Sequence, residues 1–130
     1  MAITVSGVTP LLEVFDLPAS IAFYRDMLGF TIVSGDESWW CRLRLGDATL
    51  MLNTAYEPGG RPPEPEPERV RGHADTSLYF DADPDGVYAH LRERGWPATH
   101  PVDMSYGMRQ ASTKDPDGFQ LCFIRPSGLA

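Results

Sequence analysis

The sequence predicts an α+β fold built of two βαβββ modules, because one pattern of apolar, proline and glycine residues occurs twice. Residues 11–30, LLEVFDLPASIAFYRDMLGF, are matched sixty-six residues later by residues 77–96, SLYFDADPDGVYAHLRERGW. In both copies a short apolar run leads to an acidic turn, then to a proline suited to the first helical turn, and then to a helix that ends at glycine. Because a duplicated half cannot cover its own apolar face, we expect the modules to pair and the function to lie where they meet.

The first module is predicted over about residues 5–56. Its expected elements are a strand over Thr9–Phe15, a helix over Pro18–Leu28, an extended segment over Phe30–Val33, a strand over Trp39–Leu45, a hairpin turn at Gly46-Asp47 and a strand over Ala48–Asn53. The strand over 39–45 alternates clearly and is expected to be half-buried, with Trp39, Cys41, Leu43 and Leu45 on one face and Trp40, Arg42 and Arg44 on the other.

Residues 57–71 differ from the rest of the chain, because prolines are interleaved with glutamates over this stretch. Proline removes backbone donors and restricts φ, so we expect neither strand nor helix here. The stretch is interpreted as an exposed linker between the modules. A flap over the ligand site is the alternative.

The second module is predicted over about residues 72–126. Its expected elements are a strand over Thr76–Phe80, a helix from Pro84 that ends at Gly95, a weak strand over Pro97–Val102, a strand over Met108–Ser112, a turn over Lys114–Gly118 and a strand over Phe119–Ile124. Halves of about sixty residues would be marginal if they folded separately, so we expect residues 1–130 to form a single domain.

The composition limits the kinds of molecule that we expect the protein to bind. The formal net charge of −7 argues against binding to nucleic acid or to an anionic membrane surface, and makes a neutral or cationic small molecule easier to accommodate. No basic leader and no apolar run of membrane length occur, so we expect a cytoplasmic protein. Cys41 and Cys122 lie in predicted strands without C-x-x-C spacing, and we expect buried thiols rather than a disulfide or a zinc site.

Two segments, VFDLPASIAFYRDMLGF in the first module and KDPDGFQLCF at the end of the second, resemble recurrent phrases of the vicinal oxygen chelate superfamily. This superfamily includes glyoxalase I, extradiol dioxygenases, and fosfomycin and bleomycin resistance proteins, and the chain looks nearest to its small bleomycin-resistance-like or glyoxalase-like members. The resemblance implies two βαβββ modules that form a curled eight-stranded mixed sheet, with helices outside and the ligand in the cup. It also implies a homodimer. The fold itself does not name the chemistry.

Metalloenzymes of this superfamily place one ligand on the first and one on the fourth strand of each module, usually histidine or glutamine and then glutamate. The corresponding positions here read Thr9, Met51, Thr76 and Cys122. A divalent metal that prefers imidazole and carboxylate finds neither, and Glu13 alone does not make a site. The three histidines, His73, His90 and His100, share no predicted face. We therefore expect no metal and no cofactor.

The side chains of the cup then become the candidates for function. Aromatic rings and flexible methionines with a few polar groups are typical of small-molecule sites. The segment YGMRQ, residues 106–110, also resembles the corresponding stretch of bleomycin-resistance-like proteins. The predicted ligand-binding residues are Trp40, Arg42, Met51, Asn53, Tyr106, Met108, Arg109 and Cys122. The alternative is that the two tryptophans only flank a strand and that the arginines are solvated.

The leading hypothesis is metal-independent binding of a small hydrophobic or aromatic molecule, neutral or cationic, for sequestration or resistance. No catalytic residue is assigned, because Cys122 has no histidine placed beside it and no nucleophile elbow occurs. One alternative is a lyase, isomerase or dioxygenase of the same fold that uses a divalent metal with atypical ligands. Another is a structural or regulatory dimer with an empty cup.

Overall fold

The structure is a computed structural model that describes residues 2–128. The chain divides into two compact units between Arg61 and Pro62. Each unit contains one four-stranded mixed sheet, so that eight strands in total are formed within residues 2–128. The predicted α+β fold of two βαβββ modules is confirmed.

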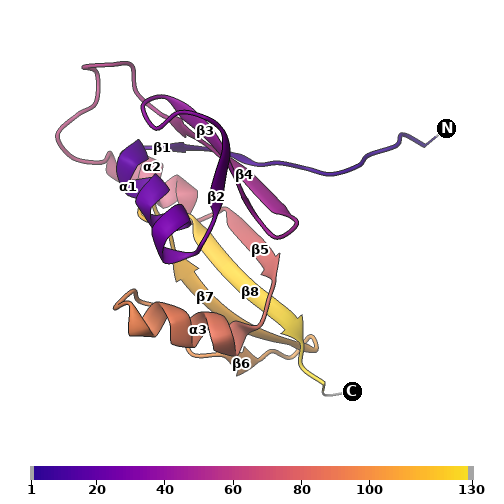
Figure 1. The fold of residues 1–130 in the computed structure, drawn as a ribbon. Coiled ribbons are helices and arrows are strands. Elements are labelled where there is room, and N and C mark those ends of the chain that lie inside the picture. Colours follow the sequence, from indigo (N-terminus) through magenta and orange to yellow (C-terminus); the bar gives the residue numbers. More distant parts are fainter. Residues whose placement is uncertain (1, 129–130) are drawn as a thin grey trace. The chain divides into compact units, whose positions relative to one another are not determined.

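The first unit has the element order β1 (Leu11–Val14), α1 (Leu17–Ile21), η1 (Ala22–Met27), β2 (Thr31–Gly35), β3 (Trp40–Leu45) and β4 (Ala48–Thr54), as labelled in Figure 1. The strand order across its sheet is β1-β4-β3-β2. Strand β1 runs parallel to β4, whereas the β2–β3 and β3–β4 pairs are antiparallel. The turn and helix between β1 and β2 supply the crossover that such a unit requires.

The helical segment of the first unit starts within one residue of the predicted position and changes from an α-helix to a π-helix along its length. Asp16 caps it, since its carboxylate accepts a hydrogen bond from the Ala19 N–H at 3.1 Å, and Pro18 lies in the first turn. One predicted helix becomes a short α-helix, α1, followed by the π-helical turn η1. Its inward side chains are buried together with alternate residues of the sheet: Leu17, Ile21, Phe23 and Tyr24 with Leu12, Val14, Cys41, Leu43, Leu50 and Leu52.

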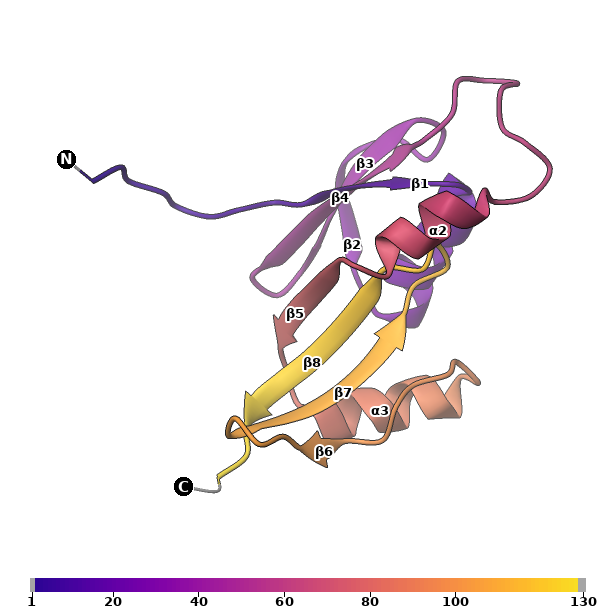
Figure 2. The ribbon, with the colours of Figure 1, turned by 180° about the vertical axis from the view of Figure 1, so that it is seen from behind.

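The second unit has the element order α2 (Pro67–His73), β5 (Ser77–Asp81), α3 (Pro84–Glu93), β6 (Val102–Asp103), β7 (Met108–Lys114) and β8 (Gln120–Pro126), which Figure 2 shows from behind. Its strand order is β5-β8-β7-β6, with β5 parallel to β8 and the other pairs antiparallel. The first and second units therefore repeat one topology. The core beneath α3 contains Leu91, Ala111, Leu121 and Phe123.

The prediction that no helix forms in residues 57–71 is wrong at its C-terminal end, where α2 begins at Pro67. Proline fits the first turn of a helix, because its missing N–H would have no intrahelical partner there. Side chains of α2 hold it against the turn before β8. His73 Nδ1 lies 3.0 Å from Asp117 Oδ2, its ring stacks on Phe119 with centroids 3.9 Å apart, and Arg69 pairs with Asp117 at 3.4 Å. Residues 57–66 contain neither helix nor strand, so that part of the prediction is confirmed.

The weak strand predicted over Pro97–Val102 is reduced to the two residues of β6, with one isolated bridge between Ala98 and Thr113. Pro97 and Pro101 cannot donate backbone hydrogen bonds, which explains the interruption. No helix within residues 2–128 is long and apolar enough to cross a bilayer.

Candidate functional site

The face of the first sheet that points away from the core gathers four of the predicted ligand-binding residues. Trp40 lies opposite Asn53, and Arg42 lies opposite Met51, in the antiparallel pairing of β3 with β4. Side chains two residues apart on a strand share a face, so the four form one continuous patch. The residues that alternate with them, Cys41, Leu43 and Leu52, are fully buried on the other face. The predicted alternation of β3 is confirmed over residues 41–44.

Strand β1 extends this patch on the far side of β4. Leu11 lies beside Met51, and Glu13 lies beside Asn53, in the parallel pairing of β1 with β4. Leu11, the first residue of the edge strand β1, is 48 % exposed. We call the set Leu11, Glu13, Trp40, Arg42, Met51 and Asn53 the Trp40 face.

The guanidinium of Arg42 is held in place at one end of the Trp40 face. It donates a hydrogen bond from Nη2 to Thr9 Oγ1 at 3.1 Å, and Thr9 Oγ1 lies 2.9 Å from Thr49 Oγ1. Arg42 is nevertheless exposed, so its remaining donors face solvent. An indole, a thioether, a leucine and a held guanidinium can together stack on an aromatic ring and donate hydrogen bonds to its substituents.

Trp39 differs from its assignment by the alternation. It lies just outside β3 and is 46 % exposed instead of buried. The preceding turn explains this, because the Asp36 carboxylate accepts hydrogen bonds from the Ser38 and Trp39 N–H groups at 2.8 and 3.1 Å. The hydrogen bonds from Ser38 are the main cause that lowers the pKa of Asp36 below its usual value. The turn therefore positions Trp39 before the regular strand begins.

In the second unit a chain of polar contacts surrounds Cys122. Tyr106 donates its hydroxyl proton to Gln110 Oε1, and Gln110 Nε2 lies 3.7 Å from Cys122 Sγ. Tyr79 lies opposite Cys122 in the pairing of β5 with β8 and is 58 % exposed. We call Tyr79, Tyr106, Gln110 and Cys122 the Cys122 face. The sequence prediction includes Tyr106 and Cys122 but misses Tyr79 and Gln110. The even spacing from Gln110 to Met108 could have indicated Gln110, whereas Tyr79 is an odd number of residues from the predicted position Thr76.

Burial determines the chemistry of this thiol. Desolvation is the main cause that raises the pKa of Cys122 above its usual value, and the neighbouring Cys122 sulfur raises the pKa of Tyr79. Both groups are therefore protonated at neutral pH. A protonated thiol is a poor nucleophile and a poor metal ligand. Because Cys122 itself is fully buried, the side chains that this face exposes most are Tyr79 and Tyr106.

Arg109 does not join the Cys122 face. It alternates with Gln110 and shares the side of β7 that carries buried Ala111. Its guanidinium lies 2.8 Å from Asp85, at the start of α3, and 3.1 Å from Asp103. The hydrogen bond from Arg109 is the main cause that lowers the pKa of Asp85. Arg109 thus ties α3 to the β6–β7 hairpin, while Met108 keeps the same side as Gln110 and is partly buried.

The profile of the Glyoxalase/Bleomycin resistance protein/Dioxygenase superfamily matches residues 8–123 of the chain. The chain belongs to this superfamily. Among solved structures, it is similar to TnmS3, an antibiotic binding protein from Streptomyces sp. CB03234, with 25 % identity, a TM-score of 0.72, and 97 % of this chain and 100 % of that chain covered. It is also similar to a bleomycin-binding protein complexed with bleomycin, with 27 % identity, a TM-score of 0.69, and 95 % and 100 % covered.

A third solved structure, a lactoylglutathione lyase from Agrobacterium tumefaciens, shares 21 % identity with a TM-score of 0.67, and 92 % of each chain is covered. This likeness concerns the fold alone. No curated protein matches the chain in sequence.

The four positions that correspond to metal ligands in the superfamily can be described within each unit. Thr9 lies beside Thr49, and Met51 lies beside Leu11. Thr76 is exposed before β5, and its carbonyl accepts a hydrogen bond from the Gln120 N–H at 3.3 Å. Within the part of the chain that the structure describes, no three His, Cys, Asp or Glu side chains are grouped so as to hold a metal ion.

The histidines have other contacts, as described for His73 above. His100 Nε2 lies 3.2 Å from the Tyr88 hydroxyl, and the two rings are 4.7 Å apart. His90 lies in α3. None of these rings belongs to the Trp40 face or to the Cys122 face.

Proposed function

We propose that this protein binds a small, partly aromatic molecule of the antibiotic type without a metal ion, and acts by sequestration rather than by catalysis. The observation that carries the proposal is the likeness, at 25 and 27 % identity over nearly the whole chain, to an antibiotic binding protein and to a bleomycin-binding protein. The net charge of −7 favours a neutral or cationic ligand.

The chemistry of the Trp40 face supports this proposal. Binding sites for small molecules combine apolar and aromatic surface with a few polar groups in fixed positions. Trp40, Met51 and Leu11 supply the apolar surface, while Arg42, fixed by Thr9, and Asn53 supply hydrogen bonds. Tyr106, Met108 and Cys122 of the second unit stay predicted ligand-binding residues, although the Cys122 thiol is fully buried, and Arg109 is engaged by two carboxylates.

A ligand screen tests the proposal directly. Bleomycin and a panel of aromatic antibiotics are added to the protein in the presence of EDTA, and the midpoint of thermal unfolding is measured. At least one compound should raise the midpoint in a concentration-dependent way, because a ligand that binds only the folded state stabilises it. Stabilisation that requires an added divalent metal would favour the metalloenzyme alternative.

Metal content is a separate prediction. Protein purified without chelator should contain no stoichiometric divalent metal by elemental analysis, and EDTA should leave the unfolding midpoint unchanged. The reason is that Thr9, Met51 and Thr76 are weak ligands and that burial keeps Cys122 protonated. Near one metal per chain would contradict the metal-independent mechanism.

We also propose a homodimer. Residues 2–10 contain no helix or strand, and three of their apolar side chains are strongly exposed: Ile3 at 87 %, Val5 at 69 % and Val8 at 87 %. Association with a second copy of the chain would remove these apolar side chains from water, which supports the proposal. The cytoplasmic location stays a prediction.

Sedimentation should give twice the chain mass, and Ile3→Asp should shift the protein toward monomer because a charge would replace apolar surface. Thr4→Asp is the matched control, since it adds the same charge at the neighbouring exposed position. A wild-type monomer at all concentrations would contradict the homodimer.

A further inference from the structure

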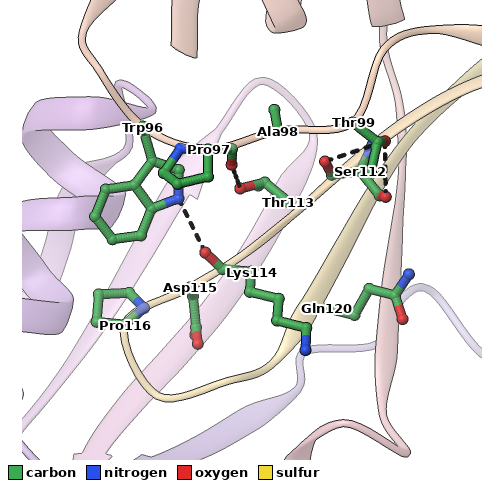
Figure 3. A pocket seen from close by; sticks show the side chains of 10 residues that line it. All are labelled: Trp96, Pro97, Ala98, Thr99, Ser112, Thr113, Lys114, Asp115, Pro116 and Gln120. Atoms are coloured by element: carbon green, nitrogen blue, oxygen red, sulfur yellow. Dashed lines mark hydrogen bonds between the residues drawn. The ribbon is translucent and has the colours of Figure 1, made fainter. Parts of the chain in front are cut away.

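A groove in the second unit lies outside the predicted ligand-binding residues. Its volume is about 740 Å³, and it is bounded by Trp96–Thr99 on one side and by the end of β7, the following turn and the start of β8 on the other. Figure 3 shows its lining, with Trp96 and Pro116 at one end and Lys114 reaching toward Gln120. A volume of this order suits a small organic molecule.

The wall formed by Trp96–Thr99 is fixed to β7 before any ligand arrives. The Trp96 indole N–H donates to the Lys114 carbonyl at 3.0 Å, and Thr113 Oγ1 donates to the Pro97 carbonyl. The Thr99 N–H donates to the Ser112 carbonyl at 2.8 Å, and the Ser112 N–H donates to Thr99 Oγ1 at 2.9 Å. A wall held in this way loses little conformational entropy when a ligand binds.

The polar groups of the groove differ in what they can offer a ligand. The Trp96 N–H and the Thr99, Ser112 and Thr113 hydroxyl groups already have protein partners. Asp115 Oδ1 accepts hydrogen bonds from the Asp117 and Phe119 N–H groups, both at 2.9 Å. Its carboxylate therefore stabilises the turn that contains it. What remains apolar is the indole ring with Pro97, Ala98 and Pro116.

Lys114 is the exception among these polar groups. Its ammonium makes no hydrogen bond or ion pair with any other residue in the range 2–128, and the side chain is exposed along the groove. It is also the only lysine of the sequence, in a chain of net charge −7. A groove with an indole and proline rings at one end and an ammonium group without a partner toward the other forms a site with an apolar wall and one positive charge.

We propose that this groove binds a flat aromatic molecule that carries one anionic group, such as an aromatic carboxylate. The ring lies against Trp96 and the proline rings, and the anionic group pairs with Lys114. This site is separate from the Trp40 face and takes a ligand of the opposite charge from the neutral or cationic molecule proposed above. Its failure would leave the proposed function untouched.

The test uses 2-naphthoate as the probe and 2-naphthylmethylammonium as its cationic counterpart. Binding is followed by NMR through the three tryptophan indole N–H signals, with the Trp96 signal assigned from Trp96→Phe. We expect 2-naphthoate to shift the Trp96 signal with saturation and to leave the Trp39 and Trp40 signals in place. The cationic compound should not shift the Trp96 signal.

Variants then test the role of the charge. Lys114→Gln should weaken naphthoate binding by about tenfold or more, because charge-assisted hydrogen bonds are the strong ones, while Lys114→Arg should retain most of the affinity. Arg71→Gln, which removes an exposed charge of α2 outside the groove, controls for the net charge and should have no effect. Equal binding by wild type and Lys114→Gln, equal binding of the cation, or no saturable shift of the Trp96 signal would overturn the proposal.

Discussion

Replacement of Leu52 by alanine is expected to lower the free energy of unfolding by about 2–5 kcal/mol, the usual cost of truncating a leucine in a core. Leu52 is fully buried in β4, between Leu12 of β1 and Cys41 of β3, both of which are also buried. Packing on both sides prevents the cavity from collapsing, so the cost should lie well inside this range.

Met51 is the matched control, because it is the neighbouring residue on the same strand and points to the opposite face. It is only partly buried, so Met51→Ala should cost less than about 1 kcal/mol of stability, as is usual away from a core. Urea unfolding followed by tryptophan fluorescence in a Trp96→Phe background reports on the first unit, where Trp39 and Trp40 lie. A larger loss for Met51→Ala than for Leu52→Ala would mean that the faces of β4 are exchanged, since a shift of one residue moves every side chain to the other face.

Local rules were enough to predict most of the elements of the fold. The alternation over residues 39–45 predicted the first strand of a pair, and the tight turn at Gly46-Asp47 predicted its antiparallel return over residues 48–53, which the pairing of β3 with β4 confirms. The acidic turn and the proline that follows it predicted the start of the first helix to within one residue. These features depend on residues close together in the sequence, so a single chain suffices to predict them.

Three features could not be predicted in this way, because each depends on a contact distant in the sequence. Helix α2 forms within a proline-rich stretch because its side chains contact residues more than forty positions away. Arg69 and His73 both bind Asp117, and the His73 ring stacks on Phe119. Arg109 does not lie with the other predicted residues, because its guanidinium binds Asp85, which is twenty-four residues earlier in the sequence. The groove at Trp96 depends on hydrogen bonds to β7 that no local pattern indicates.

The positions of the site residues along the chain also explain which of them could be predicted from the sequence. Trp40, Arg42, Met51 and Asn53 were found together because all four lie on two consecutive strands joined by a short hairpin. Tyr79 was missed because it reaches Cys122 from β5, more than forty residues earlier in the sequence. Gln110, in contrast, lies only twelve residues from Cys122 on the β7–β8 hairpin, so local spacing could have indicated it.

Trp40→Ala is expected to weaken binding of the compound that most stabilises the wild-type protein by about 1–3 kcal/mol, as is typical of an aromatic anchor. The indole sits between Asn53 across the strand pair and Arg42 two residues along β3, so its removal takes away the largest apolar surface of the Trp40 face. Titration calorimetry with that compound measures the change. Stability should fall little, because Trp40 is only partly buried.

Trp39 supplies the control that separates this role from a general effect of losing a tryptophan. The sequence alternation alone would place Trp39 in the core, but it is 46 % exposed and lies before β3, so Trp39→Ala should change neither the affinity nor the stability by more than about 0.5 kcal/mol. Loss of affinity in Trp39→Ala with full affinity in Trp40→Ala would show that the ligand contacts the turn before β3. The Trp40 face would then have no part in binding, since its central ring could be removed without effect.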